Sequence, residues 1–197
     1  SAFSFNRANG YVNTSQIFNQ STFSVSVWFK ANSLVNGTNI LNNGFYSTDN
    51  AGATSNKSWQ LRLGWGNGEK VYFCAGNSTD STCLGNSSNH AGIPGYLSAN
   101  NWHHVVVSYD GSNGNTSFYL NGIVNWTDSR ANMNLPTEAL LIGRDPGVSS
   151  NTIFNGVIDD VLMFNIPLRL ERLQVCITHR QISILIILHL WLLEAIV

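Results

Sequence analysis

The segment that decides the fold class reads Asn101-Trp-His-His-Val-Val-Val-Ser-Tyr-Asp-Gly111. From Trp102 to Tyr109 it is rich in β-branched and aromatic residues, which are the residue types enriched in strands. The pair Asp110-Gly111 then supplies the residues that turns prefer. We therefore predict a strand over 102–109 that ends in a turn.

The sequence after this strand predicts a β-hairpin. Phe118 and Leu120 precede the pair Asn121-Gly122, and a second apolar run, Ile123–Trp126, follows it. Asn-Gly between two such runs is the strongest short-range hairpin signal, because both turn residues need a positive φ.

Further strands are predicted on both sides of the hairpin. Over 23–30, apolar residues alternate with other side chains at a period of two, which is typical of a half-buried strand. Similar segments cover 59–65, 71–74, 139–142 and 157–164. About ten short strands separated by Gly, Asn and Ser turns predict an all-β sandwich or barrel.

Six segments also resemble a known family when they are taken in order. They read FSFNRANGYV (3–12), FSVSVWFK (23–30), NWHHVVVSYDG (101–111), FYLNG (118–122), LIG (141–143) and FNGVIDDVLMFNIPL (154–168). Together they are similar to laminin G-like domains of the concanavalin A-like lectin/glucanase superfamily, which include pentraxin-like jelly rolls. The resemblance covers 1–175 and implies a two-sheet antiparallel jelly-roll β-sandwich. Residues 176–197 form a separate apolar C-terminal tail.

The composition predicts a secreted glycoprotein. Hydrophobic residues make up 43% of the chain, enough for a core, while only 11% of the residues are charged and the net charge is -1. With no basic patch, we expect no nucleic-acid partner. N-linked glycans would supply the missing polarity. The alternative is an Asn-rich β-protein that is never glycosylated. The Asn-x-Ser/Thr acceptors are Asn13, Asn19, Asn36, Asn56, Asn77, Asn86, Asn115 and Asn125.

The cysteines also predict an oxidising compartment. Cys74 and Cys83 flank a short polar segment. A disulfide between them would close a loop of about ten residues and contribute about 2.5–3 kcal/mol of stability. Cys176 is left as a buried free thiol or an intermolecular link. Because the chain begins at Ser1, we expect the mature form of a secreted protein.

No residue pattern predicts catalysis. Glycoside hydrolases of this superfamily use paired carboxylates on one strand face, and the four Glu of this chain lack that spacing. Asp159 and Asp160 are neighbours in a predicted strand, so we expect them on opposite faces, and the same holds for His103 and His104. We predict a non-enzyme that requires no cofactor. A degenerate glycosidase is the enzymatic alternative.

The resemblance implies two ligand sites. Laminin G-like domains often bind Ca²⁺, and the matching positions here are Asn6, Asp145 and Asp159. The alternative role for such residues is turn capping. Exposed aromatic rings would stack on sugars, and Trp59 and Trp65 share one face of a predicted strand. Leu61 and Leu63 lie between them, and such a row is more often part of a core than a sugar platform.

The C-terminal tail is unusually apolar. At a period of two, one face of residues 182–192 carries only aliphatic side chains. They are Ile182, Ile184, Ile186, Leu188, Leu190 and Leu192. As a helix, residues 182–197 would reach about 24 Å, short of the roughly 30 Å hydrocarbon core of a membrane. A strand packed on its own domain and a strand docked on a neighbouring subunit both stay open, and a membrane contact is disfavoured.

We therefore predict a secreted, N-glycosylated laminin G-like module without catalytic activity. Its function would be extracellular recognition or adhesion, with a carbohydrate or protein ligand. The alternative is a structural subunit of a glycan-coated extracellular fibre, in which the C-terminal strand docks on the next subunit.

Overall fold

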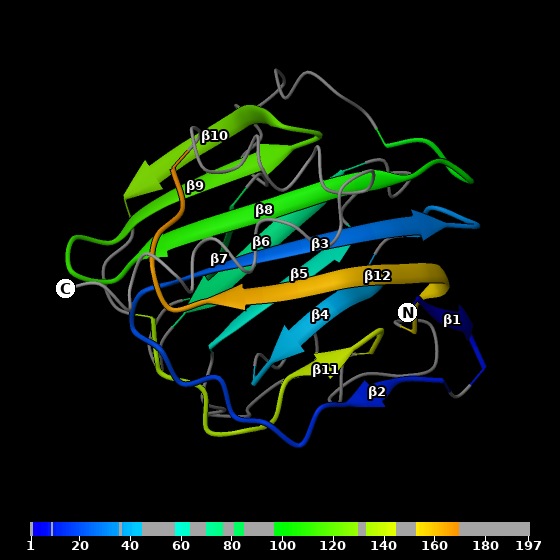
Figure 1. Cartoon of the computed structure of the whole chain (residues 1–197), viewed down its shortest axis with the longest axis horizontal. Helices are drawn as coiled ribbons and strands as arrows, with labels where there is room; N and C mark the ends of the chain where they lie inside the picture. Colours follow the sequence, from blue (N-terminus) through cyan, green and yellow to red (C-terminus); the bar gives the residue numbers. More distant parts are fainter. Residues whose placement is uncertain are drawn as a thin grey trace, which may run out of the picture.

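The chain folds into two antiparallel sheets that face each other across one hydrophobic core (Figure 1). The computed structural model describes residues 2–8, 10–35, 37–44, 58–63, 70–76, 81–84, 97–129, 133–144 and 153–169. Each sheet has six strands, so the predicted all-β jelly-roll sandwich is confirmed. In these described ranges, no helix has the length and hydrophobicity required to cross a membrane.

Sheet 1 contains the strands that the sequence predicted most directly. Its strand order is β1-β12-β3-β8-β9-β10, with β1 and β10 at its edges. The strands are β1 (Phe3–Asn6), β12 (Asn155–Phe164), β3 (Phe23–Ala31), β8 (His103–Asp110), β9 (Asn115–Leu120) and β10 (Ile123–Ser129).

Sheet 2 has the order β2-β11-β4-β5-β6-β7. Its strands are β2 (Val12–Asn13), β11 (Leu141–Ile142), β4 (Asn39–Asn43), β5 (Trp59–Leu63), β6 (Val71–Gly76) and β7 (Ser81–Leu84). Because β1 and β2 are edge strands of different sheets, the segment 3–12 is not one strand. The chain leaves sheet 1 after Asn6 and enters sheet 2 at Val12.

The predicted Asn-Gly hairpin is confirmed. Asn121 and Gly122 have φ of 50° and 81°, and they join β9 to β10 with Leu120 opposite Ile123. Asn121 also ties the turn to β8. Its Oδ1 accepts a hydrogen bond from the His104 N–H at 2.9 Å, and its own N–H donates to the His104 carbonyl at 2.8 Å.

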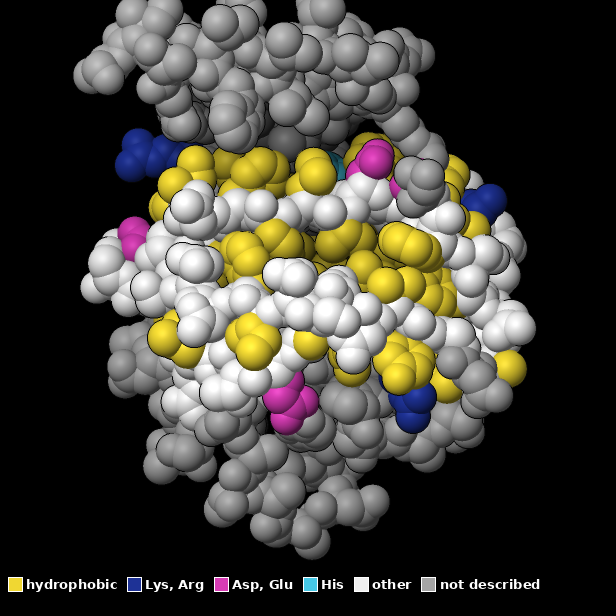
Figure 2. Space-filling model, turned by 60° about the horizontal axis from the view of Figure 1, so that its bottom comes forward, with side chains coloured by type: hydrophobic (Ala, Val, Ile, Leu, Met, Phe, Trp, Pro, Cys, Tyr) yellow, Lys and Arg dark blue, Asp and Glu magenta, His cyan; other side chains and the backbone are white. Residues whose placement is uncertain are grey.

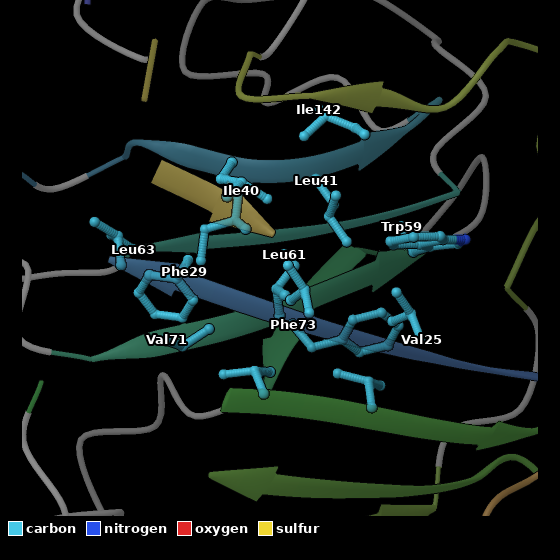
Figure 3. Close-up of a cluster of buried hydrophobic side chains, with 14 of the residues drawn as sticks. Val25, Phe29, Ile40, Leu41, Trp59, Leu61, Leu63, Val71, Phe73 and Ile142 are labelled. Atoms are coloured by element: carbon cyan, nitrogen blue, oxygen red, sulfur yellow. The ribbon is translucent and has the colours of Figure 1, made fainter. Parts of the chain in front are cut away.

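The core lies between the two sheets and is built from alternate residues of the strands (Figure 3). The four apolar positions of 23–29 are fully buried, as their alternation predicted. From sheet 2, Trp59 and Phe73 meet them. The Trp59 ring stacks on Phe23 with centroids 5.3 Å apart. Such aromatic pairs add stabilisation beyond the burial of their apolar surface.

A β-bulge in β12 changes the expected position of two carboxylates. Asp159 pairs with Trp28 of β3, but the next pair is Leu162 with Ser26, so the register shifts between them. Asp160 lies in this bulge with a φ of 47°. Asp160 therefore departs from the regular alternation on which the predicted opposite faces of Asp159 and Asp160 depended, and both residues line the groove at the sandwich edge. A bulge breaks the period of two on which the prediction depended.

Candidate ligand-binding site

A hollow of about 300 Å³ lies on the outer face of sheet 2, at the edge formed by β2 and β11. Val12 and Ile142 pair across these strands and point into the core, so their neighbours in the chain point outward. The hollow is lined by Tyr11, Asn13, Glu138, Ala139, Leu141 and Arg144.

Two backbone features hold the two sides of the hollow together. On one side, the Thr14 N–H and hydroxyl both donate to the Leu140 carbonyl, at 3.1 and 3.0 Å. On the other, Gly143 has a φ of 86° and donates its N–H to the Ile40 carbonyl at 2.9 Å. A Cβ at Gly143 would come within 2.7 Å of the Phe5 ring. The positive φ and the close Phe5 ring favour glycine at this turn, and the next residue, Arg144, lies over the Tyr11 ring.

The most distinctive pair in the hollow is Tyr11 and Arg144. The Arg144 guanidinium carbon lies 5.0 Å from the centroid of the Tyr11 ring, a cation–π arrangement. Tyr11 nevertheless keeps 44% of its surface exposed. A cation–π contact at an exposed site contributes about 0.5–1 kcal/mol, enough to orient the ring without burying it.

The hollow combines a flat aromatic surface with several hydrogen-bonding groups. Arg144 and Tyr11 supply donors, while Asn13 and Glu138 supply exposed oxygen acceptors. This combination suits a ligand that is flat and apolar on one face and rich in hydroxyls at its edge, such as a sugar ring. Glu138 is the one carboxylate in this lining, whereas two-carboxylate glycoside hydrolysis needs a pair. The described arrangement is therefore suited to binding.

A row of polar side chains continues from the hollow across the outer face of sheet 2. Leu141 of β11 is opposite Asn42, Asn42 is opposite Gln60, and Gln60 is opposite Cys74. Gln60 is fully buried, yet neither its amide nitrogen nor its amide oxygen has a hydrogen-bond partner among the residues that the structure describes. A buried polar group without a partner costs about 1–3 kcal/mol. Within the described part of the chain, the buried Gln60 amide is therefore left with unsatisfied polar atoms.

Trp59, one of the two predicted sugar platforms, is a core residue instead. Its side chain is fully buried and stacks on Phe23 at 5.3 Å. The prediction of Trp59 as a ligand-binding ring was wrong because this face of β5 points toward sheet 1, not toward solvent. Trp65 lies outside the described residues.

Two of the three predicted calcium ligands do not come together. Asn6 pairs with Asn155 at one end of the β1–β12 pair, and Asp159 lies just beyond Ile158 at the other end. Asp159 lies four positions along the strand from Asn155, a distance of about 13 Å at about 3.3 Å per residue. One ion cannot bind both side chains, so this pairing was wrong. Asp145 lies outside the described residues, and a calcium site there stays a prediction.

The two histidines lie on opposite faces of β8, as expected for strand neighbours. The His103 ring packs near Phe29, with centroids 5.7 Å apart, and its Nε2 lies 3.1 Å from the Ser98 carbonyl oxygen. The His104 ring stacks on Trp28 on the outer face of sheet 1. Their predicted inability to bind one ion together is confirmed by this geometry.

The described glycan acceptors are exposed. The side chains of Asn13, Asn19 and Asn115 face solvent. Asn125 lies in β10, and its side chain is outside the described part, as are Asn36, Asn56, Asn77 and Asn86. Glycosylation stays a prediction that the three exposed positions permit.

The structure describes the strands of the predicted disulfide but not the predicted assembly residues. Cys74 of β6 is the register partner of Cys83 of β7, the cross-strand position that the predicted disulfide requires. Cys176 lies outside the described residues. The same is true of the predicted assembly residues Ile182, Ile184, Ile186, Leu188, Leu190 and Leu192.

Sequence reasoning did not single out Tyr11 or Arg144. Tyr11 follows Gly10 at the start of β2, and Arg144 follows Gly143 at the end of β11. The two residues are far apart in the chain and meet only through the β2–β11 pairing. Each residue directly follows a glycine, but that pattern alone does not distinguish a site from an ordinary strand end.

The chain matches the family model of the concanavalin A-like lectin/glucanases superfamily over residues 6–174. This match confirms the resemblance carried by the six sequence segments. No curated protein matched the chain.

Solved structures with the same fold include three of different origin. A heptameric SAP-like pentraxin from Limulus polyphemus is 14% identical, with a TM-score of 0.63 over 89% of this chain and 81% of its own. A putative carbohydrate binding protein from Bacteroides ovatus is 17% identical, with a TM-score of 0.62 over 87% and 45%. The receptor binding domain of botulinum neurotoxin type G is 14% identical, with a TM-score of 0.61 over 91% and 42%. These identities show a shared fold, and this chain spans less than half the length of the last two.

Proposed function

This chain belongs to the concanavalin A-like lectin/glucanase superfamily, and we propose that it is a non-catalytic extracellular recognition module that binds carbohydrate through the hollow on sheet 2. The observation that carries this proposal is the exposed Tyr11 ring, held beside Arg144 and bordered by Asn13 and Glu138. A sugar ring would lie against the aromatic face while its hydroxyls bond to the surrounding polar groups.

The fold relatives support this proposal. One of them is described as a putative carbohydrate binding protein, and another as a receptor binding domain. Different members of one fold family carry their functions in local sites, so the hollow itself, and not the fold alone, is the basis of the proposal. A protein ligand at the same hollow is the second outcome that the fold relatives allow.

Secretion and glycosylation form part of the same proposal. They are supported by the eight acceptor motifs, by the exposure of Asn13, Asn19 and Asn115, and by the low content of charged residues. A disulfide between Cys74 and Cys83 would fit an oxidising compartment. Because Asn13 borders the hollow, a glycan on this residue would compete with a ligand for the Tyr11 face.

The alternative of a fibre subunit stays a prediction. Its assembly residues, 182–192, lie outside the described residues. It also requires contacts between copies of the chain, whereas the proposed carbohydrate site uses residues of a single copy.

An array of defined oligosaccharides tests the proposal. The full chain is applied with its N-glycans present and after their enzymatic removal, beside the variants Tyr11→Ala and Leu135→Ala. Leu135 is a matched control because it is 45% exposed and does not line the hollow. We expect selective binding that Tyr11→Ala abolishes and Leu135→Ala retains. An array without signal, or binding that Tyr11→Ala does not change, would exclude carbohydrate recognition at this hollow.

A further inference from the structure

A second, larger depression lies where the two sheets separate at the edge of the sandwich. It has a volume of about 510 Å³ and runs between β1 and β12 of sheet 1 and β2 and β11 of sheet 2. Its walls are mostly apolar and include Phe3, Val12, Phe18 and Ile142, with Asp159 and Asp160 also in the lining. Figure 2 looks onto this edge and shows hydrophobic side chains gathered in the depression. We refer to it as the edge groove.

The edge groove adjoins an unpaired stretch of strand. β1 pairs with β12 from Phe3 opposite Ile158 to Asn6 opposite Asn155. Beyond Ile158, β12 continues to Phe164 and pairs with β3 on its other side. Among the described residues, no strand pairs with Asp160–Phe164 on the side where β1 ends. An open strand edge beside an apolar groove is a position where another extended segment can add to the sheet.

We propose that the chain's own C-terminal segment, within residues 182–192, occupies the edge groove as an added strand. One face of this segment is aliphatic at six alternate positions, from Ile182 to Leu192. In an added strand that face would fill the groove while the backbone pairs with the free edge of β12. This inference is independent of the proposed function, because the edge groove and the hollow are different sites.

Charge favours the same occupant. The apolar segment is preceded by a basic stretch that includes Arg172 and Arg180. The edge groove carries two carboxylates, Asp159 and Asp160, which the bulge in β12 brings to the same lining. The described lining contains no basic side chain to neutralise them. A segment with Arg next to an aliphatic run therefore complements both the negative charge of the two aspartates and the apolar wall of the edge groove.

The connection is long enough for docking within one copy. Arg169 is the last described residue, and residues 170–181 join it to Ile182. Twelve extended residues span up to about 40 Å, whereas a folded domain of this size has a radius of gyration of about 15 Å. A tethered segment also has a high effective concentration at a site on its own domain. Docking within the chain is therefore favoured over docking on a second copy.

Photo-crosslinking in the full chain tests the proposal. The photoreactive residue p-benzoylphenylalanine replaces Phe3, which is 43% exposed and lines the edge groove. The control carries it at Leu135, which is 45% exposed and lies outside the groove. Irradiation of a mixture of ¹⁵N-labelled and unlabelled protein distinguishes links within one copy from links between copies. The products are mapped by mass spectrometry.

We expect position 3 to link to a peptide from 182–192 of the same copy, and position 135 to give no such link. Replacing Asp159 and Asp160 with Asn should lower the yield several-fold, whereas Asp110→Asn, at a site remote from the lining, should not. A link that joins labelled and unlabelled copies would overturn the proposal in favour of a second copy as the occupant. The absence of a link to 182–192 would overturn it outright.

Hydrogen exchange provides a test that does not depend on an inserted photoreactive residue. In the unmodified chain, the amides of Asp160–Phe164 that point away from β3 should exchange slowly, because the added strand bonds to them. The variant Ile184→Asp/Ile186→Asp should exchange at these amides at least tenfold faster, with the β9–β10 hairpin unchanged. Fast exchange in the unmodified chain would contradict the proposal.

Discussion

The indole ring of Trp28 lies almost parallel to the imidazole of His104, with centroids 4.8 Å apart and planes at 21°. The Ser26 hydroxyl lies 2.8 Å from His104 Nε2. His104 is almost fully buried. Burial disfavours the charged imidazolium and lowers the pKa of His104 from 6.5 to about 4.

This arrangement predicts a loss of stability in mild acid. The unfolded chain protonates His104 near pH 6.5, while the folded chain resists protonation until about pH 4. The unfolded state therefore binds more protons between these values, and the free energy of unfolding falls as the pH falls through this window. The burial of neutral His104 lowers the free energy of unfolding by up to about 3 kcal/mol, and this loss is complete below about pH 4. Urea unfolding at pH 7, 5.5 and 4 measures this loss of unfolding free energy.

The double variant Ser26→Ala/His104→Phe isolates this contribution. Phenylalanine keeps a ring against Trp28 without a titrating group, and the alanine removes the hydroxyl that would lose its partner. Carboxylates titrate equally in both proteins, so the difference between their stability curves reports on His104. Identical pH dependence in the two proteins would show that the burial of His104 has no such effect.

Gly156 should be intolerant of substitution. Its φ is 146°, and a Cβ at this position would lie 2.1 Å from the Lys30 carbonyl oxygen of β3. Since the clash is with backbone, it can be relieved only by moving β12 away from β3. We expect Gly156→Ala to lower the free energy of unfolding by about 2–3 kcal/mol. The control Gly10→Ala, whose Cβ would meet only the Phe5 ring at 3.7 Å, should change it by less than about 1 kcal/mol.

Replacing Trp59 should lower the stability of the fold without changing the affinity for carbohydrate. Its removal leaves a cavity between Phe23 and Phe73, the two rings that pack against it. We expect Trp59→Ala to destabilise the protein by about 3–5 kcal/mol in urea unfolding. The fraction that remains folded should bind carbohydrate with unchanged affinity. A stable Trp59→Ala protein that has lost its ligand would restore the sugar-platform interpretation.

The paired positions of Cys74 and Cys83 predict a disulfide that mass spectrometry can identify. Peptide mapping without reduction should recover residues 74 and 83 in one cross-linked peptide. In the loop-entropy treatment, the variant Cys74→Ala/Cys83→Ala should be less stable by about 2.5–3 kcal/mol. Recovery of both cysteines as alkylated thiols from protein secreted by a eukaryotic cell would rule the disulfide out.

Strands with strong local patterns could be predicted from the sequence, and strands without them could not. The 23–30 alternation and the Asn121-Gly122 turn specify β3 and the β9–β10 hairpin locally. β4 was missed because Asn-Ile-Leu-Asn-Asn has no alternation and is rich in a residue that strands disfavour. It is a strand because it lies between β11 and β5, where every one of its side chains is buried. That burial is a tertiary effect.

The candidate site was harder to predict than the fold. Tyr11 and Arg144 are joined by strand pairing and by the turn at Gly143, neither of which leaves a local pattern around Tyr11. The shared lining of Asp159 and Asp160 depends on a bulge, and a bulge is invisible to an argument from periodicity. The family resemblance predicted the two-sheet antiparallel sandwich correctly but suggested a ligand-binding role for Trp59, which packs in the core.

Calorimetric titration tests the central claim most directly, using the oligosaccharide with the highest array signal. Deglycosylated full chain is compared with Tyr11→Ala, Arg144→Ala and the exposure-matched control Leu135→Ala. If carbohydrate binds at the hollow, both site variants should weaken binding at least tenfold, about 1.4 kcal/mol, while the control binds as the parent does. Equal affinity in all four proteins would contradict the account and place recognition elsewhere on the sandwich.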